Sequence, residues 1–540
     1  MTRTRVSIWA YAVVALLLTV PATVAISRAD TGIVRTATVV SGVPVTVLAP
    51  DGAVGKLPGV VVAHGFASSS TIMESLGVSL ARAGYVVAMP DFRGHGENAA
   101  PLPLGPDGTV RADVLQDDLS VVVDWLALQP EVDPEHLGLV GHSMGAGAVV
   151  RFAVADATGP QRIDATVAVS LPSADDVPVG DVAVPRDLLL MWGSAERPIF
   201  EAAGEEALKA GYPEGVVGQS YGSGADGTAR GTFVVPGVEH IGIVFSPVAA
   251  QQMVDWFDST VAVGSTGHTV APDSKVLWLL VLLAGATVGF VPLARLAFGA
   301  RRAEPSEHAP VVRARWVIPA TVASALVASL GGALLAGRPA LLPLSVADYT
   351  VVWFGVAGLV GWLIAWWLGR RGATGKSVDV PGDETEAADS RPRGVGRQVL
   401  ATLALTAYLV AVLALASQHT WSDFAVVGAR RWVLPVVEVT MIVFFWADER
   451  LVARPSRGRR ILLVTANRVI VVVALMLAVA WLGAPGVLIL WVPLVALFFV
   501  LLAVCAHVVS GLTRERWAPA VVQAIPLAYV IATAFPLIGS

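Results

Sequence analysis

Apolar positions divide the chain into a short first stretch, a mixed middle part and a long apolar remainder. Residues 7–26 are almost all apolar, and about 20 such residues span the hydrocarbon core of a bilayer as a helix. Residues 28–274 contain no apolar run of that length. From Lys275 onward, apolar runs recur at about 276–298, 316–337, 350–368, 398–416, 432–447, 461–483, 486–510 and 518–538. The pattern predicts an all-α, polytopic membrane domain over residues 275–540, with about eight helices besides the first stretch.

The first stretch has two interpretations. Arg3 and Arg5 precede it, which favours a cytoplasmic N-terminus. The small residues between Ala22 and Ser27 would also permit cleavage. Residues 1–27 are therefore a transmembrane signal anchor, which we favour, or a signal peptide, and residues 28–274 are expected to be exported.

Charges between the apolar runs support this topology. The connections expected in the cytoplasm carry, together with the N-terminus, 19 Lys and Arg residues, whereas the short outer connections carry three. This imbalance predicts that residues 28–274 and the C-terminus face the extracytoplasmic side of the cell membrane. The polar, Gly- and Pro-rich segment 372–396 is expected to be a flexible cytoplasmic loop.

Composition and charge exclude several classes of protein and of site. Hydrophobic residues make up 55% of the chain and charged residues 15%, which differs from a simple soluble enzyme. Residues 28–274 hold 12 Lys and Arg against 29 Asp and Glu, and neither part is typical of a nucleic-acid binder. Cys505 is the single cysteine, which excludes a disulfide framework and a Cys-based metal centre. We expect no metal and no cofactor.

Short β-branched runs alternate with helical patterns in the middle part of the chain. Alternation of this kind is typical of an α/β domain with a mostly parallel sheet that helices cover on both faces. Helices are predicted over residues 69–83, 113–128 and 248–261. Strands are predicted within residues 59–65, 85–96, 136–145, 165–170, 187–194 and 231–240.

One motif in this domain contains a candidate catalytic serine. Gly141-His142-Ser143-Met144-Gly145 has the pattern G-x-S-x-G between a predicted strand and a predicted helix start. Such a turn strains the serine backbone and lifts its hydroxyl above the sheet edge, and the helix N-terminus favours developing negative charge. The alternative is a Gly-rich strand-to-helix turn without chemistry.

The segments VVVAHGF (60–66), MPDFRGHGE (89–97) and VDPEHLGLVGHSMGAG (132–147) resemble the α/β-hydrolase superfamily. The resemblance covers roughly residues 40–260 and is close to dienelactone-hydrolase-like and lysophospholipase-like serine hydrolases. Dienelactone hydrolases proper use a Cys nucleophile. Ser143 departs from that pattern and points to general esterase chemistry.

The resemblance implies a catalytic triad in the order serine, acid, histidine. Ser143 is the implied nucleophile and His240, after the last predicted strand, the implied base. Glu196 stands where the family pattern has Asp, and either carboxylate can orient an imidazole. Asp175 or Asp176 is the alternative acid, whereas Glu239, next to His240, is expected to point away from it.

The same resemblance places the oxyanion hole on two backbone N–H groups, those of Phe66 and Met144. Arg93 and His95 are expected to brace the loop beside it, and a substrate-binding role for Arg93 stays open. Residues 200–230, the longest insertion, either cover the substrate pocket or form a surface loop.

Two ionisable residues lie inside predicted membrane helices, and such residues are functional candidates by default. Glu438 and Arg468 fall at similar depths on antiparallel neighbours. We favour a salt bridge between them. A transport or substrate-channel role, or an Arg468 that reaches to the inner face, are the alternatives.

The sequence thus predicts a membrane-anchored bacterial serine hydrolase that cleaves carboxylic esters of the envelope or of lipids. Its expected partners are an ester substrate and the lipid bilayer. An acyltransferase with the same triad is one alternative. A non-catalytic ligand-binding or transport protein is the other.

Overall fold

The computed structural model describes residues 2–539 except 105–111, 262–269, 271–273, 300–311, 336, 337, 339, 374–393, 419–424 and 453–456. Most of the loop predicted at 372–396 lies outside the described residues. The chain forms two compact units. The sheet unit comprises Pro21–Leu280, Leu415–Arg430 and Thr533–Ser540. The helical unit comprises Met1–Val20, Val281–Ala414 and Arg431–Ala532.

A nine-stranded sheet forms the centre of the sheet unit, in the order β1-β2-β4-β3-β6-β7-β8-β10-β9. The strands from β4 to β10 run parallel, and β1, β2 and β9 join the edges antiparallel, which confirms the predicted mostly parallel sheet. The strands are β1 (Ile33–Val40), β2 (Val43–Pro50), β3 (Leu57–Ala63), β4 (Val86–Pro90), β6 (Val132–His142), β7 (Ile163–Val169), β8 (Leu188–Gly193), β9 (Ser220–Tyr221) and β10 (Arg230–Val235). A separate parallel pair joins β5 (Leu102–Pro103) to β11 (Ile538–Gly539).

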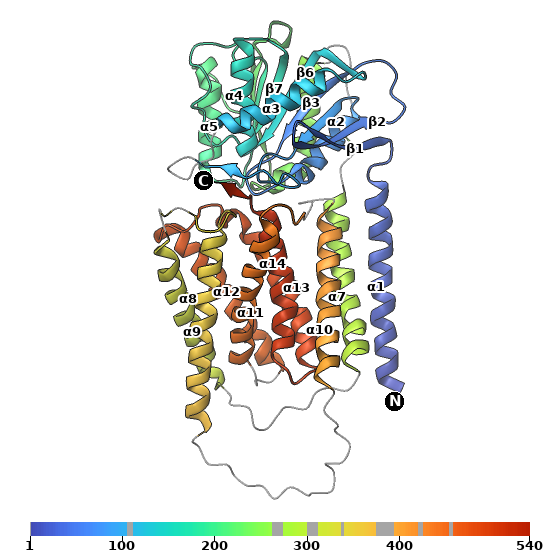
Figure 1. The fold of residues 1–540 in the computed structure, drawn as a ribbon. Helices are drawn as coiled ribbons and strands as arrows, with labels where there is room; N and C mark the ends of the chain where they lie inside the picture. Colours follow the sequence, from blue (N-terminus) through green and yellow to red (C-terminus); the bar gives the residue numbers. More distant parts are fainter. Residues whose placement is uncertain are drawn as a thin grey trace, which may run out of the picture. The chain divides into compact units, whose positions relative to one another are not determined.

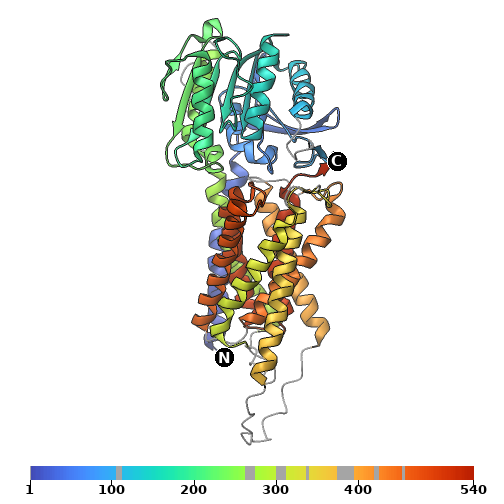
Figure 2. The ribbon, with the colours of Figure 1, turned by 90° about the vertical axis from the view of Figure 1, so that its left-hand side faces the viewer.

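Helices cover both faces of this sheet (Figures 1 and 2). Side chains alternate along each strand, so Val60 and Val62 enter one hydrophobic core while Val61 and Ala63 enter the core on the opposite face. The first core includes α2 and α6, and the second includes α3 and α4. The helices are α2 (Glu74–Arg82), α3 (Ala112–Ala127), α4 (Met144–Ala157), α5 (Pro198–Gly211) and α6 (Pro247–Thr260), with 3-10 turns η1 (Ser70–Met73), η2 (Gly224–Asp226) and η3 (Gly242–Phe245).

The predicted insertion at residues 200–230 is not one long loop. It begins within α5, whose residues Phe200, Ala207 and Leu208 pack against Trp192 of β8. The following residues form β9 and η2 and return to β10. The segment therefore completes one face of the sheet.

Long helices form the helical unit and its connections to the sheet unit. They are α1 (Thr2–Arg28), α7 (Lys275–Phe298), α8 (Val317–Ala333), α9 (Ala347–Ala373), α10 (Val395–Ser417), α11 (Arg430–Leu451), α12 (Arg457–Trp481), α13 (Leu488–Ser510) and α14 (Trp517–Ala534). A short 3-10 turn, η4 (Ala314–Trp316), directly precedes α8. Eight helices in the described part of the chain, α1 among them, are long and apolar enough to cross a membrane. The predicted span 432–447 falls in α11, which is not among these eight and carries Glu438, Asp448 and Glu449.

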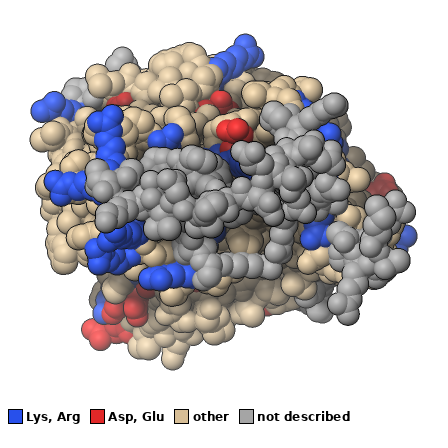
Figure 3. All heavy atoms as spheres, turned by 90° about the horizontal axis from the view of Figure 1, so that it is seen from below, with Lys and Arg blue, Asp and Glu red and all other residues tan. Residues whose placement is uncertain are grey.

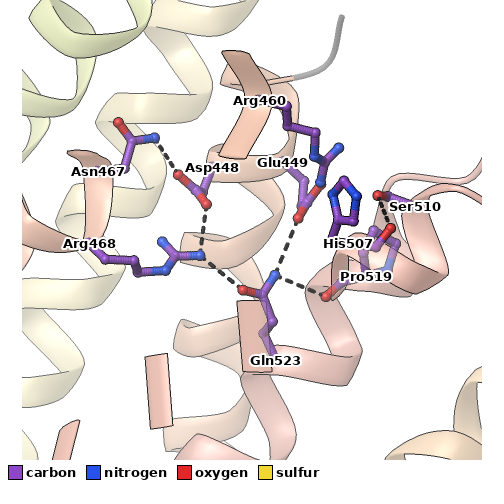
Figure 4. A network of polar contacts seen from close by, with 9 residues as sticks. All are labelled: Asp448, Glu449, Arg460, Asn467, Arg468, His507, Ser510, Pro519 and Gln523. Carbon is purple, nitrogen blue, oxygen red and sulfur yellow. Dashed lines mark hydrogen bonds and ion pairs between the residues drawn. The ribbon is translucent and has the colours of Figure 1, made fainter. Parts of the chain in front are cut away.

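A buried polar network links four helices of this unit, and Figure 4 shows its contacts among α11, α12 and α14. Asp448 of α11 accepts hydrogen bonds from Asn467 Nδ2 at 2.7 Å and from Arg468 Nη2 at 2.9 Å, both on α12. Arg468 also donates to Gln523 of α14 at 2.9 Å, and Thr321 of α8 donates to Asn467 at 2.9 Å. The network binds four helices through directed contacts that apolar packing alone does not supply.

The predicted pair between Glu438 and Arg468 is wrong, because Arg468 pairs with Asp448. A helical side chain points toward the N-terminus of its own helix. Arg468 therefore reaches back toward the turn between α11 and α12, where Asp448 lies, while Glu438 points away from that turn. Among the described residues, no hydrogen bond or ion pair involves the half-buried Glu438.

Removal of one carboxylate charge should distinguish these two acids. Asp448→Asn should destabilise the helical unit by about 3 kcal/mol, because it removes the carboxylate charge that is paired with the buried Arg468. Glu438→Gln is the matched control and should change stability by less than about 1 kcal/mol. Thermal unfolding of the purified full-length protein in detergent measures both. Equal melting temperatures for the two variants would contradict the assignment of the network.

Candidate active site

A strained turn presents Ser143 between β6 and α4. The residue has φ 55° and ψ −116°, a conformation that L-residues rarely adopt. A Cβ on Gly141 would stand 2.2 Å from the carbonyl oxygen of Gly145, and a Cβ on Gly145 would stand 2.4 Å from that of Ala63. Glycine at both positions is therefore what allows the chain to turn this sharply against the neighbouring strand.

The structure brings Ser143, Glu196 and His240 together. His240 Nε2 lies 3.1 Å from Ser143 Oγ, and His240 Nδ1 lies 2.9 Å from Glu196 Oε2. The side chains of His240 and Glu196 are 6% and 1% exposed. The imidazole thus lies between a hydroxyl and a buried carboxylate, the arrangement in which it can take the hydroxyl proton.

The second oxygen of Glu196 is also held. Its Oε1 accepts a hydrogen bond from Ser170 Oγ at 2.7 Å and one from the N–H of Gly193 at 2.8 Å. Ser170 directly follows β7 and has φ 56°. These donors orient the carboxylate toward His240, and no sequence motif had singled out Ser170.

The alternative acids lie elsewhere. Asp176 forms an ion pair with Arg151 at 2.8 Å, and Asp175 is exposed. Glu239 turns back on its own loop, where it accepts hydrogen bonds from the N–H groups of Ile241 at 2.8 Å and Gly242 at 2.7 Å.

Two further side chains hold His240 in place. His142 Nε2 donates to the carbonyl oxygen of His240 at 2.9 Å. The ring of Phe200, from α5, stacks on the His240 ring with 4.3 Å between the centroids. The sequence had placed His142 only within the motif, and the contact of Phe200 depends on the packing of α5 against the sheet.

The loop after β3 supplies the second side of the site. Gly65 lies so close to Ser143 that a Cβ on it would stand 3.2 Å from Ser143 Cβ. In the part of the chain that the structure describes, the N–H groups of Phe66 and Met144 donate no hydrogen bond within the protein. Both donors are therefore available to a negatively charged oxygen bound beside Ser143.

Burial keeps the histidines around this loop uncharged. It lowers the pKa of His64 to about 4 and the pKa values of His95 and His142 well below the ordinary value. The guanidinium of Arg93 is paired with Asp118 of α3 at 3.0 Å, so it holds its own loop against that helix. Within the described ranges, no cluster of three or more His, Cys, Asp or Glu side chains could hold a metal ion.

One known protein family matches part of the sheet unit. Residues 58–190 match the family model of the serine aminopeptidases, S33. The sheet order, the strand–turn–helix at Ser143 and this match decide the fold family. The sheet unit is an α/β-hydrolase domain. The predicted fold is thereby confirmed.

Curated relatives cover only part of the chain. An uncharacterized protein of Mycobacterium tuberculosis is 30% identical over 199 residues, which are 34% of this chain and 64% of the relative. An uncharacterized 31.7 kDa protein from the traX-finO intergenic region of Escherichia coli is 28% identical over 148 residues, 27% of this chain and 46% of its own length. The chain thus spans less than two thirds of the length of these relatives.

Two solved structures are similar to each other in how much of this chain they cover. Dienelactone hydrolase from Anabaena variabilis is 21% identical and covers 43% of this chain and 99% of its own, with a TM-score of 0.32. A CIB-like hydrolase from Thermoplasma acidophilum is 19% identical and covers 42% of this chain and 98% of its own, with a TM-score of 0.32.

Two glycines of α4 should respond to substitution with opposite signs. Gly145→Ala should destabilise the hydrolase domain by about 2 kcal/mol or more, because the new Cβ meets the Ala63 backbone at 2.4 Å. Gly147→Ala should stabilise it by up to about 1 kcal/mol, because the nearest atom is 3.8 Å away and alanine favours helix. Thermal unfolding of the two variants measures the difference. A stable Gly145→Ala protein would contradict the close packing at this turn.

Proposed function

We propose that the protein is a membrane-anchored serine hydrolase that cleaves carboxylic esters through an acyl-serine intermediate. The observation that carries this proposal is the contact chain from Ser143 Oγ through His240 to the buried Glu196. An imidazole held in this way activates a serine hydroxyl that would otherwise be a weak nucleophile.

Acylation begins when Ser143 Oγ attacks the ester carbonyl and His240 Nε2 takes the hydroxyl proton. The N–H groups of Phe66 and Met144 bind the oxyanion of the tetrahedral intermediate, and each such donor is typically worth about 3 kcal/mol. The intermediate collapses when the bond to the alcohol oxygen breaks, and His240 gives its proton to that oxygen.

Deacylation repeats these steps with water. His240 takes a proton from a water molecule, the resulting hydroxide attacks the acyl carbonyl, and Ser143 leaves with the proton that His240 returns. Glu196 stays ionised throughout and stabilises the imidazolium. An alcohol in place of water would make the same site an acyltransferase.

We also propose that the helical unit anchors the enzyme in the cell membrane, with the hydrolase domain outside. Eight described helices have the length and composition of membrane spans. Viewed from the end that carries the N-terminus, Lys and Arg side chains occur around the described part of the face more widely than Asp and Glu (Figure 3). Such an excess of cations supports a cytoplasmic location for that end. An envelope or lipid ester is then the natural substrate class.

Active-site labelling tests the chemistry. A fluorophosphonate probe should label wild-type protein in isolated membranes, because the activated Ser143 displaces its fluoride. Ser143→Ala and His240→Ala should abolish labelling, and Glu196→Gln should slow it by about 100-fold or more. Glu239→Gln is the matched control and should label like wild type. An inserted wild-type protein that does not label would favour a ligand-binding or transport protein instead.

Cysteine accessibility tests the topology. In a Cys505→Ser background, Val54→Cys should react with a membrane-impermeant maleimide in intact spheroplasts, because Val54 is 94% exposed in the hydrolase domain. Val395→Cys, at the exposed start of α10, should react only after the membrane is opened. The reverse order of reactivity would refute the proposed orientation.

A further inference from the structure

Two segments far along the chain belong to the hydrolase domain and contact one of its loops. They are Arg430 and the C-terminal peptide, residues 533–539, both of which are part of the sheet unit. The loop they contact comprises residues 91–98, between β4 and β5. No sequence motif had connected these segments.

Arg430 makes the first of these contacts. Its side chain is fully buried, and Nη2 donates to the carbonyl oxygen of Gly94 at 2.8 Å while Nη1 donates to that of Gly96 at 3.3 Å. Nη2 also donates to the carbonyl oxygen of Phe535 at 3.2 Å. A guanidinium is a planar fork of donors, so one side chain can hold both the loop and the C-terminal peptide.

The C-terminal peptide makes the second contact. The N–H of Leu537 donates to the carbonyl oxygen of Gly94 at 2.8 Å, and the N–H of Leu102 donates to the carbonyl oxygen of Leu537 at 2.8 Å. Gly94 has φ 79°, and a Cβ on it would stand 2.2 Å from the Leu537 carbonyl oxygen. The carbonyl of Gly94 therefore receives two donors, one from Arg430 and one from the peptide.

The same loop supports the oxyanion hole. Its His95 ring lies 4.9 Å from the ring of His64 and 5.7 Å from that of Phe66, measured between centroids. The N–H of Phe92 donates to His64 Nε2 at 3.1 Å, and His64 Nδ1 donates to the carbonyl oxygen of Gly65 at 2.7 Å. These contacts join the 91–98 loop to His64 and Gly65, which directly precede Phe66 and position its N–H.

We propose that Arg430 is a positioning residue for the oxyanion hole and that the C-terminal peptide acts with it. The inference rests on the proposed function, because it assigns a role in the same reaction. Arg430 touches no reacting atom. It fixes the carbonyls of Gly94 and Gly96, the loop fixes His64 and the Phe66 ring, and these fix the donor that meets the oxyanion.

Loss of Arg430 should weaken stabilisation of the transition state more than it weakens substrate binding. Oxyanion donors act on charge that develops during the reaction, so their misplacement lowers kcat and leaves KM nearly unchanged. A displacement of a few tenths of an ångström weakens such a donor without removing it. The expected loss is therefore smaller than the 100-fold or larger loss typical of deleting a donor.

The test compares Arg430→Gln with Arg431→Gln in the full-length protein in detergent. Arg431 is the exposed neighbour and serves as the matched control. For Arg430→Gln we expect the rate constant of fluorophosphonate labelling and kcat for p-nitrophenyl butyrate to fall about tenfold, with KM within twofold of wild type. Arg431→Gln should leave all three values unchanged.

Two more variants keep the test decisive if Arg430→Gln does not fold. Arg430→Lys should recover part of the labelling rate, because an ammonium can reach one carbonyl but cannot hold both. Deletion of Leu537–Ser540 removes the peptide's donor to Gly94 and should lower the rate in the same way. The melting temperature of each variant separates an effect on stability from an effect on rate.

A labelling rate per folded molecule equal to that of Arg431→Gln, with only a lower melting temperature, would overturn the inference and leave the proposed function standing. Absence of labelling in the wild-type protein would remove both, since there would be no oxyanion to position.

Discussion

The turn at Ser143 is the constraint on which the rest of the site depends. A positive φ at Ser143 is tolerated because Gly141, Gly145 and the backbone of Ala63 pack against one another at distances that no side chain allows. That packing requires β3 and β6 to be parallel neighbours, as they are. The carboxyl ends of β3 and β6 then bring Gly65 beside Ser143, so Ser143 lies next to the loop that carries the proposed oxyanion donor.

Glu196 and His240, the proposed acid and base, come to Ser143 from two other strands, and hydrogen bonds hold their side chains. Glu196 follows β8 and His240 follows β10, which are parallel neighbours. Donors from Ser170 and Gly193 occupy one carboxylate oxygen and leave the other for His240. Side chains held in this way need little reorganisation in the proposed reaction, and such preorganisation is the main source of electrostatic catalysis.

The central strands could be predicted from their β-branched runs, and the turn at Ser143 from the G-x-S-x-G motif, because both are local patterns. Glu196 and His240 are far from Ser143 in the chain, so their roles came only from the resemblance to the α/β-hydrolase superfamily. The edge strand β1 could not be predicted, since most of its side chains are exposed and show no alternation of apolar residues. The partner of Arg468 was missed because it depends on the direction of side chains along two helices. The contacts of Arg430 could not be predicted either, because they join residues more than 300 positions apart.

Arg430 and the C-terminal peptide, although late in the chain, are part of the hydrolase domain. Arg430 hydrogen-bonds to Gly94, in the loop beside the proposed oxyanion donors, and to Phe535 of the peptide. The proposed function depends on an acyl-serine intermediate. Rapid acid quenching of the reaction with p-nitrophenyl butyrate, followed by peptide mass spectrometry, detects such an intermediate. We expect a butyryl group on the peptide that contains Ser143, absent when Ser143 is replaced by Ala. A butyryl group on another residue, or turnover of the ester with no acylated peptide, would contradict it.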